Sequence, residues 1–411
     1  MRRVIFAIIV FFSFAVVKAQ FATSHTESVR TPVMVVNDEW SAPAVIELGG
    51  DDVIHFSFDE MSHVYHRYTC RITHHNADWS ISELAEINYL DGFNDFVIDS
   101  WENSRNTTQL YTHYAFELPN DDIAFKASGN YRVEIYDEED CENPVVTFEF
   151  SVLEPKVDVS TSVSGDTEHS YNDGEQQLSF IVNHARCNVV SPASDLVTVI
   201  YQNRRRDNAV IGVQPTYMTG TQAEYVHNAK LIFEAGNEFR RFELTDPNSP
   251  GMNVEEVVYH DSAYHALLYV DKPRHSYSNV IDENGRFFVN TLEGYGTTIE
   301  ADYVNVHFAI DMPYRPGGNF YLLGDFCGNT FDKKNMLFYD KEEGYYFTSH
   351  LLKLGVYNYQ YAWLPNTADK ATVGVTEGEF YNTGNEYLIY VYHREFGARY
   401  DKLVGFAVVA E

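Results

Sequence analysis

Residues 73–114, THHNADWSISELAEINYLDGFNDFVIDSWENSRNTTQLYTHY, form a long stretch rich in aromatic side chains. Strand-like runs flank it, at 63–72 and at 131–136, so we expect an excursion between strands of one sheet. A loop of this length inside a compact domain usually has a function or is held by a small core of its own. The stretch therefore indicates an all-β domain with one elaborated connection.

Two hypotheses remain open for this stretch. In the first, Trp79 anchors a small core of the loop, since fully exposed tryptophan is uncommon, and a short helix covers 80–84. In the second, Asp91 forms a tight turn with the glycine that follows it, and Phe93 and Trp101 are apolar anchors for a partner protein. Further residues of the stretch are expected to be structural: Asn106, Thr107, Tyr111 and His113.

The composition favours strands and excludes two classes of partner. Of the 411 residues, 45% are hydrophobic and 15% aromatic, and aromatic residues are enriched in strands. The formal net charge is -31, and removal of residues 1–19, which hold three basic and no acidic residues, would make it -34. Such a surface repels nucleic acid and anionic membranes, so neither is an expected partner.

The first nineteen residues have the features of a secretory signal peptide. Arg2 and Arg3 precede an apolar run at 4–17, and Val17-Lys18-Ala19 has small residues where signal peptidase requires them. The run is too short to be a typical membrane-spanning helix. We expect cleavage after Ala19, a mature chain that starts without a cysteine for lipid attachment, and no later spanning helix.

The rest of the chain divides into three predicted β-sandwich domains. Short alternating runs separated by turns extend through residues 20–154, and their spacing is typical of an immunoglobulin-like sandwich. A second β segment is predicted at 155–297, including a hairpin at 280–289, and a third at 298–411. The runs at 386–393 and 402–409 are predicted to complete the third sandwich. No stretch has the sustained 3.6-residue period of a major helix.

Charged residues of the central segment are interpreted structurally. Arg204, Arg205 and Arg206 form the only triple basic run, and a solvated turn is the favoured interpretation. Glu238 and Arg240 are two residues apart and would share a face of a strand, so we predict that they form a polar pair beside a buried Phe239.

No pattern of catalytic or ligand-binding residues stands out. The chain lacks the nucleophile-elbow, zinc-protease, phosphate-loop and dinucleotide sequences, and no catalytic residue, cofactor or metal is predicted. The adjacent residues His74 and His75 would point to opposite faces of a strand, which disfavours a metal site. In an oxidising compartment Cys70 and Cys141 could form a disulfide, but the sequence does not decide whether they do.

Several segments, in one order along nearly the whole mature chain, resemble the type IX secretion system plug proteins of Bacteroidetes. They are HNADW at 75–79, YLDGF at 89–93, SRNT at 104–107, YTHY at 111–114, SGNY at 128–131, YQN at 201–203, GNEFR at 236–240, EADYV at 300–304, LKLGVYNY at 352–359, EG at 377–378 and NEY at 385–387. The resemblance implies a non-catalytic periplasmic protein at the inner face of the outer membrane. Its implied role is to close the periplasmic mouth of the translocon barrel. Cys70 and Cys141 depart from the family pattern.

A second resemblance covers only the C-terminal part. The runs FYLLGDF at 320–326 and LLKLGVYNYQY at 351–361 are similar to early-set sandwiches related to glycogen-binding modules. Those modules stack sugars on a tryptophan a few residues after the Gly-Asp-Phe sequence, whereas Cys327-Gly328-Asn329-Thr330 stands there in this chain. Trp363 is the only tryptophan nearby, so the architecture is expected and sugar binding is not.

The sequence therefore predicts an all-β protein of tandem sandwiches that binds and occludes the translocon barrel. We expect a monomer within a hetero-complex. Two alternatives remain: a carbohydrate-binding module of the periplasm or surface, and secreted cargo of the same system. The chain end at 404–411, VGFAVVAE, lacks the basic tail expected of a cargo sorting domain.

Overall fold

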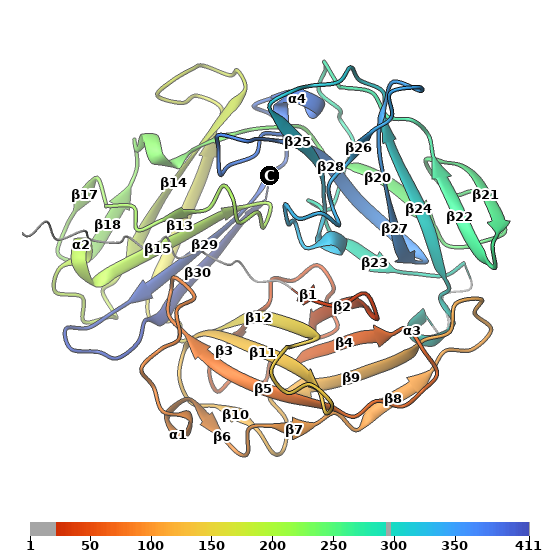
Figure 1. Cartoon of the computed structure of the whole chain (residues 1–411). Helices are drawn as coiled ribbons and strands as arrows, with labels where there is room; N and C mark the ends of the chain where they lie inside the picture. The colour runs from red at the N-terminus through yellow and green to blue at the C-terminus, as the bar shows by residue number, and fades with distance from the viewer. Residues whose placement is uncertain (1–21, 293–296, 411) are drawn as a thin grey trace, which may run out of the picture.

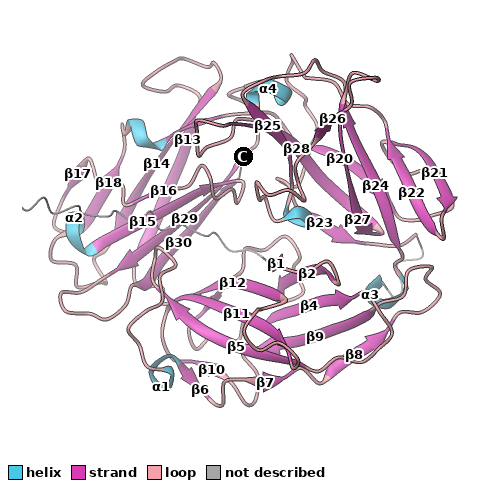
Figure 2. Cartoon of the chain, viewed as in Figure 1, coloured by secondary structure: helices cyan, strands magenta, loops and turns pink. Residues whose placement is uncertain are grey.

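The computed structural model describes residues 22–292 and 297–410 of the chain, and the predicted signal peptide at 1–19 lies outside the described residues. Strands dominate them, as Figure 2 shows, and the helices are single short turns. They are α1 (Glu86–Tyr89), α2 (Pro192–Asp195), α3 (Thr297–Glu300), α4 (Gly374–Glu377), η1 (Ala229–Leu231) and η2 (Asp325–Cys327). The prediction of an all-β fold is confirmed. Among these residues, no helix has the length and apolar character needed to cross a membrane.

Three β-sandwiches are arranged as a triangle (Figure 1). The first contains two large sheets with strand orders β1-β12-β11-β5-β7, where β3 is parallel to β12, and β2-β4-β9-β8, while β6 and β10 form a small separate pair. Its strands are β1 (Ala22–Ser24), β2 (Val29–Val36), β3 (Val45–Glu47), β4 (Ile54–Glu60), β5 (Tyr68–His75), β6 (Leu90–Asp91), β7 (Phe96–Val97), β8 (Ser100–Asn103), β9 (Thr112–Leu118), β10 (Ala124–Phe125), β11 (Gly129–Asp137) and β12 (Val146–Leu153).

The core of this sandwich follows from the two-residue period of its strands. In β4, Ile54, Phe56 and Phe58 are fully buried, whereas the intervening residues His55 and Ser57 are only partly buried. The ring of Phe56 stacks on Phe116 of β9 at 4.8 Å and meets Phe148 of β12 edge-on at 5.2 Å. Aromatic side chains from both sheets thus fill the space between them.

The second sandwich combines strands from two distant parts of the chain. One sheet has the order β13-β14-β18-β17 with β19 on β14, and the other β16-β15-β29-β30. Its strands are β13 (Asp158–Ser164), β14 (Glu175–Asn183), β15 (Leu196–Gln202), β16 (Val210–Ile211), β17 (Tyr217–Met218), β18 (Gln222–Tyr225), β19 (Ile232–Glu234), β29 (Glu386–His393) and β30 (Lys402–Ala410). The strands β29 and β30 were expected in the third sandwich. They pair instead with β15, in a register that joins Leu196 to His393 and Gln202 to Tyr387.

The third sandwich is inserted between β19 and β29. It contains the sheets β21-β22-β24-β27-β26 and β20-β28-β23, with β25 also on β28. Its strands are β20 (Arg240–Leu244), β21 (Val254–His260), β22 (Ala263–Leu268), β23 (Phe287–Val289), β24 (Tyr303–Ile310), β25 (Gly318–Leu323), β26 (Phe338–Tyr339), β27 (Tyr346–Lys353) and β28 (Gly355–Pro365). The strand pairing of the second and third sandwiches therefore does not follow the predicted division at residue 297.

Two local predictions are wrong. The helix expected at 80–84 is absent, and the chain forms a helical turn at Glu86–Tyr89 instead. The hairpin expected at 280–289 is also absent. Its turn exists, with positive φ angles at Asn284 and Gly285, but only Phe287–Val289 is a strand, and it pairs with β28. At 280–289 the local turn signal was therefore correct, but the strand that follows the turn pairs with a distant segment.

Candidate functional site

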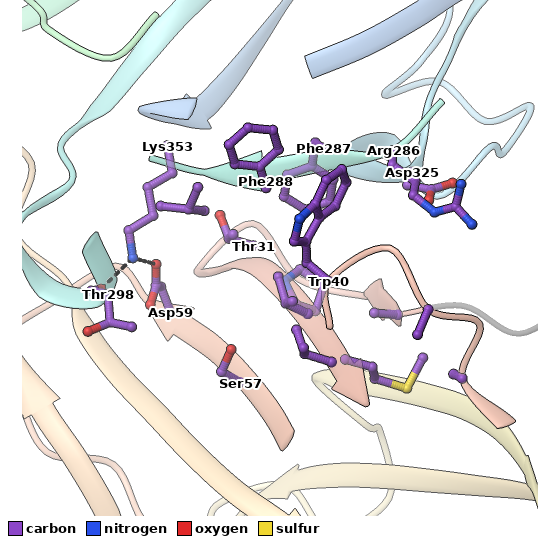
Figure 3. A pocket seen from close by; sticks show the side chains of 18 of the residues that line it. Thr31, Trp40, Ser57, Asp59, Arg286, Phe287, Phe288, Thr298, Asp325 and Lys353 are labelled. Carbon is purple, nitrogen blue, oxygen red and sulfur yellow. Dashed lines mark hydrogen bonds and ion pairs between the residues drawn. The ribbon is translucent and has the colours of Figure 1, made fainter. Parts of the chain in front are cut away.

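A cavity of about 390 Å³ lies where the three sandwiches meet. Its walls come from β2, the segment after β2, and β23, and charged side chains stand at either side (Figure 3). The strand β2 belongs to the first sandwich and β23 to the third, while Arg204 reaches the cavity from the second. The volume is in the range of small-ligand sites in proteins.

An aromatic pair lies between the two charged sides of the cavity. The rings of Trp40 and Phe288 are 4.9 Å apart and tilted by 40°. Trp40 remains 38% exposed, which is high for the largest apolar side chain. The pair therefore presents apolar surface that the fold itself does not cover.

At one side of the cavity, Asp59 of β4 is held by three side chains. Lys353 Nζ donates to Asp59 Oδ2 at 2.6 Å and to the carbonyl of Thr298 at 2.6 Å. The hydroxyl of Tyr303 donates to the same Asp59 oxygen at 2.6 Å, and His113 Nδ1 lies 2.7 Å from the other. Burial alone would raise the pKa of Asp59, but Lys353 and His113 outweigh it and hold this pKa below its ordinary value. The cluster joins the first sandwich to the third through hydrogen bonds and an ion pair.

At the opposite side, two arginines share carboxylates across the second and third sandwiches. Arg204 Nη1 lies 2.6 Å from Asp325 Oδ2, and its Nε lies 3.2 Å from Glu386 Oε1. Arg286 donates to the other oxygen of Glu386. Burial raises the pKa of Asp325 even though both arginines lower it. Among the described residues, Arg204 Nη2 and Arg286 Nε are buried without a hydrogen-bond partner.

The triple arginine run was expected to be a solvated turn, and that expectation is wrong. Arg205 pairs with Asp207 at 2.7 Å and donates to the carbonyl of Ala371 in the third sandwich. Arg206 reaches Glu149 of the first sandwich at 2.8 Å. Together with Arg204, the run joins the second sandwich to both others. Its acidic partners lie far away in sequence, so the local charge pattern did not reveal them.

The two chain crossings between the second and third sandwiches are also bonded to each other. The Asn237 amide donates to the carbonyl of Glu377 at 2.8 Å, and that of Asn385 to the carbonyl of Ala235 at 2.7 Å. Thr383 donates its hydroxyl to the carbonyl of Gly236 at 2.9 Å. Buried hydrogen bonds from side-chain amides hold neighbouring backbones in fixed geometry, so these contacts fasten the second sandwich to the third.

Glu238 and Arg240 were predicted to pair with each other, but each bonds to other residues. Arg240 bonds to Asp271 at 2.6 Å and to Glu377 at 3.0 Å, while Glu238 accepts hydrogen bonds from Tyr277 and from the backbone of Gly384. The strand β20 begins only at Arg240, so Glu238 lies outside the strand on which the shared-face argument rested. Phe239 is buried, as predicted.

Trp79 and its neighbours have structural surroundings. Trp79 is 7% exposed in a positive-φ conformation, and its carbonyl lies 2.8 Å from His75 Nδ1. Asn106 also has a positive φ, in an exposed turn, and Thr107 donates to Ser104 Oγ at 2.9 Å. The Tyr111 hydroxyl donates to the carbonyl of Ala301 at 2.9 Å. Tyr111 therefore belongs to the contact with the third sandwich, whereas His113 bonds to Asp59 within the first.

The three residues predicted to contact a partner lie on the outer surface of the first sandwich. Phe93, which follows Asp91 and Gly92, is 90% exposed. The turn that places it requires glycine, because a Cβ on Gly92 would lie 1.9 Å from the carbonyl oxygen of Asp122. Trp101 lies in the edge strand β8, is 44% exposed, and packs against Tyr65 with ring centroids 5.2 Å apart. Asp91 is exposed at the end of β6. The structure does not bring these residues into the central cavity.

The remaining candidates have structural surroundings as well. All four cysteines are free, with Cys70 buried and Cys141 exposed. Trp363 is 4% exposed and packs against Phe320 at 4.7 Å, so it offers no platform for a sugar ring. No group of three or more metal-ligating side chains was found among the described residues.

Sequence reasoning missed the residues that build the cavity. Trp40 follows a short acidic turn that matches no known motif, and Lys353 is an isolated lysine at the end of a strand. Asp59 and Lys353 are 294 positions apart, and no sequence signal links them.

Comparisons with known proteins agree with this architecture. Residues 29–154 match the model of the type 9 secretion system plug protein 1st domain. A hypothetical protein from Parabacteroides merdae, known from its crystal structure, is 39% identical; the match covers 96% of this chain and all of that one, with a TM-score of 0.93. A match to dimeric latent PorU from Porphyromonas gingivalis, at 10% identity over 93% of this chain and 34% of that one, has a TM-score of 0.16 and carries no argument. No curated protein matches the chain.

Proposed function

Since this chain belongs to the type 9 secretion system plug protein family and has a role in type IX secretion, we propose that it binds and occludes the periplasmic end of the outer-membrane translocon. The match of residues 29–154 to the plug family carries this proposal. The role is non-catalytic, and the chain acts in the periplasm after removal of its signal peptide.

The rigidity of the molecule supports an occluding role. A plug has to keep its shape against a wide opening, and tandem domains joined by flexible linkers would not do so. Here the sandwiches are joined by the buried Lys353–Asp59 pair, by the Arg206–Glu149 pair, and by the Tyr392 hydroxyl, which donates to Asn130 at 2.8 Å. Each of these contacts joins two different sandwiches.

Exposed aromatic side chains of the first sandwich supply the proposed contact surface. Phe93 and Trp101 are large, apolar and accessible, and aromatic residues commonly dominate the binding energy of protein interfaces. We assign the translocon contact to these two residues, with Asp91 at the turn between β6 and Phe93. The partner is the barrel protein, which this chain binds as a monomer within a hetero-complex.

Co-purification from outer-membrane extract tests the proposal. Tagged wild-type protein should recover a large outer-membrane barrel, identified by mass spectrometry. The double variant Phe93→Ala with Trp101→Ala should recover much less, while Phe396→Ala, which removes a fully exposed ring elsewhere, should behave as wild type. Recovery of no barrel protein by the folded wild type would refute the proposal.

A further inference from the structure

Three histidines lie on one face of the third sandwich, on three adjacent strands. His260 is in β21, His265 in β22 and His307 in β24, and β22 lies between the other two strands (Figure 1). His265 is directly opposite Val258 of β21 and Asn305 of β24. Residues two apart on a strand point to the same side, so His260 and His307 share the face of His265. The neighbours of His307 on its strand are buried in the core, so the three imidazoles are on the outward face.

Two of these imidazoles already have ring nitrogens in contact. His265 Nδ1 lies 2.9 Å from His307 Nε2, and the two ring planes differ by only 12°. Two nitrogens bound to one tetrahedral zinc ion, each about 2.0–2.1 Å from it, are about 3.3 Å apart. Both rings are only partly buried, so a small rotation of each makes room for a metal ion between the nitrogens. The neutral ring of His265 then carries its proton on Nε2 instead of Nδ1.

Ser349 of β27 supports the orientation that His307 needs. Its Oγ lies 2.7 Å from His307 Nδ1. When this Nδ1–H donates to the hydroxyl, Nε2 has a free lone pair, and that lone pair faces His265. Histidines that bind metals commonly donate their other ring N–H to a neighbouring acceptor in this way. His307 therefore has the second contact typical of a metal ligand.

A third imidazole is within reach of the pair. The ring centroid of His260 lies 6.3 Å from that of His265, and the His260 side chain is 72% exposed, so it is free to turn. Its present contact, 3.2 Å from the exposed Asp261 carboxylate, is a surface ion pair of little energetic weight. The net charge of -31 also favours a cation at this surface over an anion.

We propose that His265 and His307 bind a divalent transition-metal ion of the zinc class, with His260 turning in as the third ligand. Imidazole nitrogens suit zinc, copper and nickel, whereas magnesium and calcium prefer oxygen ligands. Water fills the fourth position. This function goes beyond translocon binding and uses other residues than Phe93 and Trp101, so the two proposals can fail independently.

Isothermal titration calorimetry of the full mature chain, without a histidine tag, tests the site. In a buffer that does not bind metals, near neutral pH, Zn²⁺ should bind saturably with one ion per chain. His265→Ala and His307→Ala should each weaken binding at least about tenfold, since even the supporting contacts of metal ligands are worth about that much. His260→Ala should weaken it less. His169→Ala, which removes an exposed histidine of the second sandwich, should have no effect.

The controls separate this site from other causes of metal binding. Thermal unfolding without metal shows whether each variant folds, and two separate ligand variants keep the test open if one of them does not. Cu²⁺ takes the same ligands, and pulsed electron paramagnetic resonance should detect two or three imidazoles bound to it.

Three results would count against the site. Absence of saturable Zn²⁺ binding, or Zn²⁺ binding that is unchanged in the folded His265→Ala and His307→Ala variants, would overturn it. Mg²⁺ binding as tight as that of Zn²⁺ would overturn the imidazole ligands and indicate the acidic surface instead. Zn²⁺ affinity that His260→Ala leaves unchanged would overturn the third ligand.

Discussion

Lys353 and Asp59 form a buried ion pair between two different β-sandwiches, with Nζ 2.6 Å from Oδ2 and side chains only 2% and 1% exposed. Lys353 ends β27 of the third sandwich, and Asp59 lies in β4 of the first. The Lys353 ammonium also lies 4.2 Å from the ring centroid of Tyr111, another residue of this contact. A buried pair contributes little relative to apolar residues of the same shape, but loss of one partner leaves the other charge without compensation.

Lys353→Met should therefore destabilise the protein by about 3 kcal/mol, since the carboxylate of Asp59 stays buried. The urea midpoint of unfolding measures the effect. The double variant Lys353→Met with Asp59→Leu should recover part of the loss. If Lys353→Met unfolds at the wild-type urea concentration, the pair does not stabilise the contact between the sandwiches.

Trp79 and Trp101 should respond in opposite ways to truncation. Trp79→Ala removes a buried ring and should cost about 3 kcal/mol of folding free energy. Trp101→Ala removes a ring that is 44% exposed, so folding should survive while translocon recovery falls. Thermal unfolding and co-purification of both variants separate the two roles. If Trp101→Ala unfolds the protein while its folded fraction still recovers the barrel, Trp101 is a core residue.

Glu379 should make stability depend on pH. Burial raises the pKa of this carboxyl to about 7, from 4.5, and Glu379 Oε2 accepts a hydrogen bond from the backbone of Gly236. Between pH 4.5 and pH 7 the Glu379 carboxyl therefore holds its proton more often in the folded state than in the unfolded state. The contribution of Glu379 to folding stability is fully present below about pH 4.5 and is lost as the pH rises through 7.

Glu379→Gln should remove that dependence. At pH 8 the variant should be more stable than wild type by on the order of 2 kcal/mol, and at pH 4 the two should be nearly equal. Chemical unfolding at both pH values measures the difference. Equal stability of the two proteins at pH 8 would show that Glu379 ionises without cost in the folded protein.

Translocon binding should resist salt. The chain carries a net charge of -31, so a mainly electrostatic contact would need a basic partner surface and would weaken steeply as salt shortens the screening length. The contact residues proposed here, Phe93 and Trp101, are apolar. We expect recovery of the barrel at 0.5 M salt to match recovery at about 0.1 M. Loss of the barrel at moderate salt would indicate a charged interface.

The sequence predicted the all-β fold class correctly but did not predict which strands pair with each other. Alternating runs such as IHFSFDE at 54–60 identify strands because burial on one face imposes a two-residue period. The same period does not say which strand is the partner. The run EYLIYVYH at 386–393 was correctly predicted to be a strand, yet its partner β15 precedes it by about 190 residues.

The candidate site was less predictable for the same reason. Arg204 looked solvated because its neighbours in sequence are polar, whereas its partners Asp325 and Glu386 approach only in the folded chain. The exposure of Phe93 could be predicted from the sequence, because the turn at Asp91-Gly92 beside it is specified by neighbouring residues. A site built by three sandwiches from distant segments has no local pattern.

Leakage through the translocon tests the central claim most directly. Cells that lack this protein but keep the rest of the secretion system should release a periplasmic marker enzyme into the medium. The wild-type chain should restore retention, and the double variant Phe93→Ala with Trp101→Ala should fail to restore it although it folds. Full retention of the marker in cells that lack the protein would contradict the account, because an unoccluded translocon should leak.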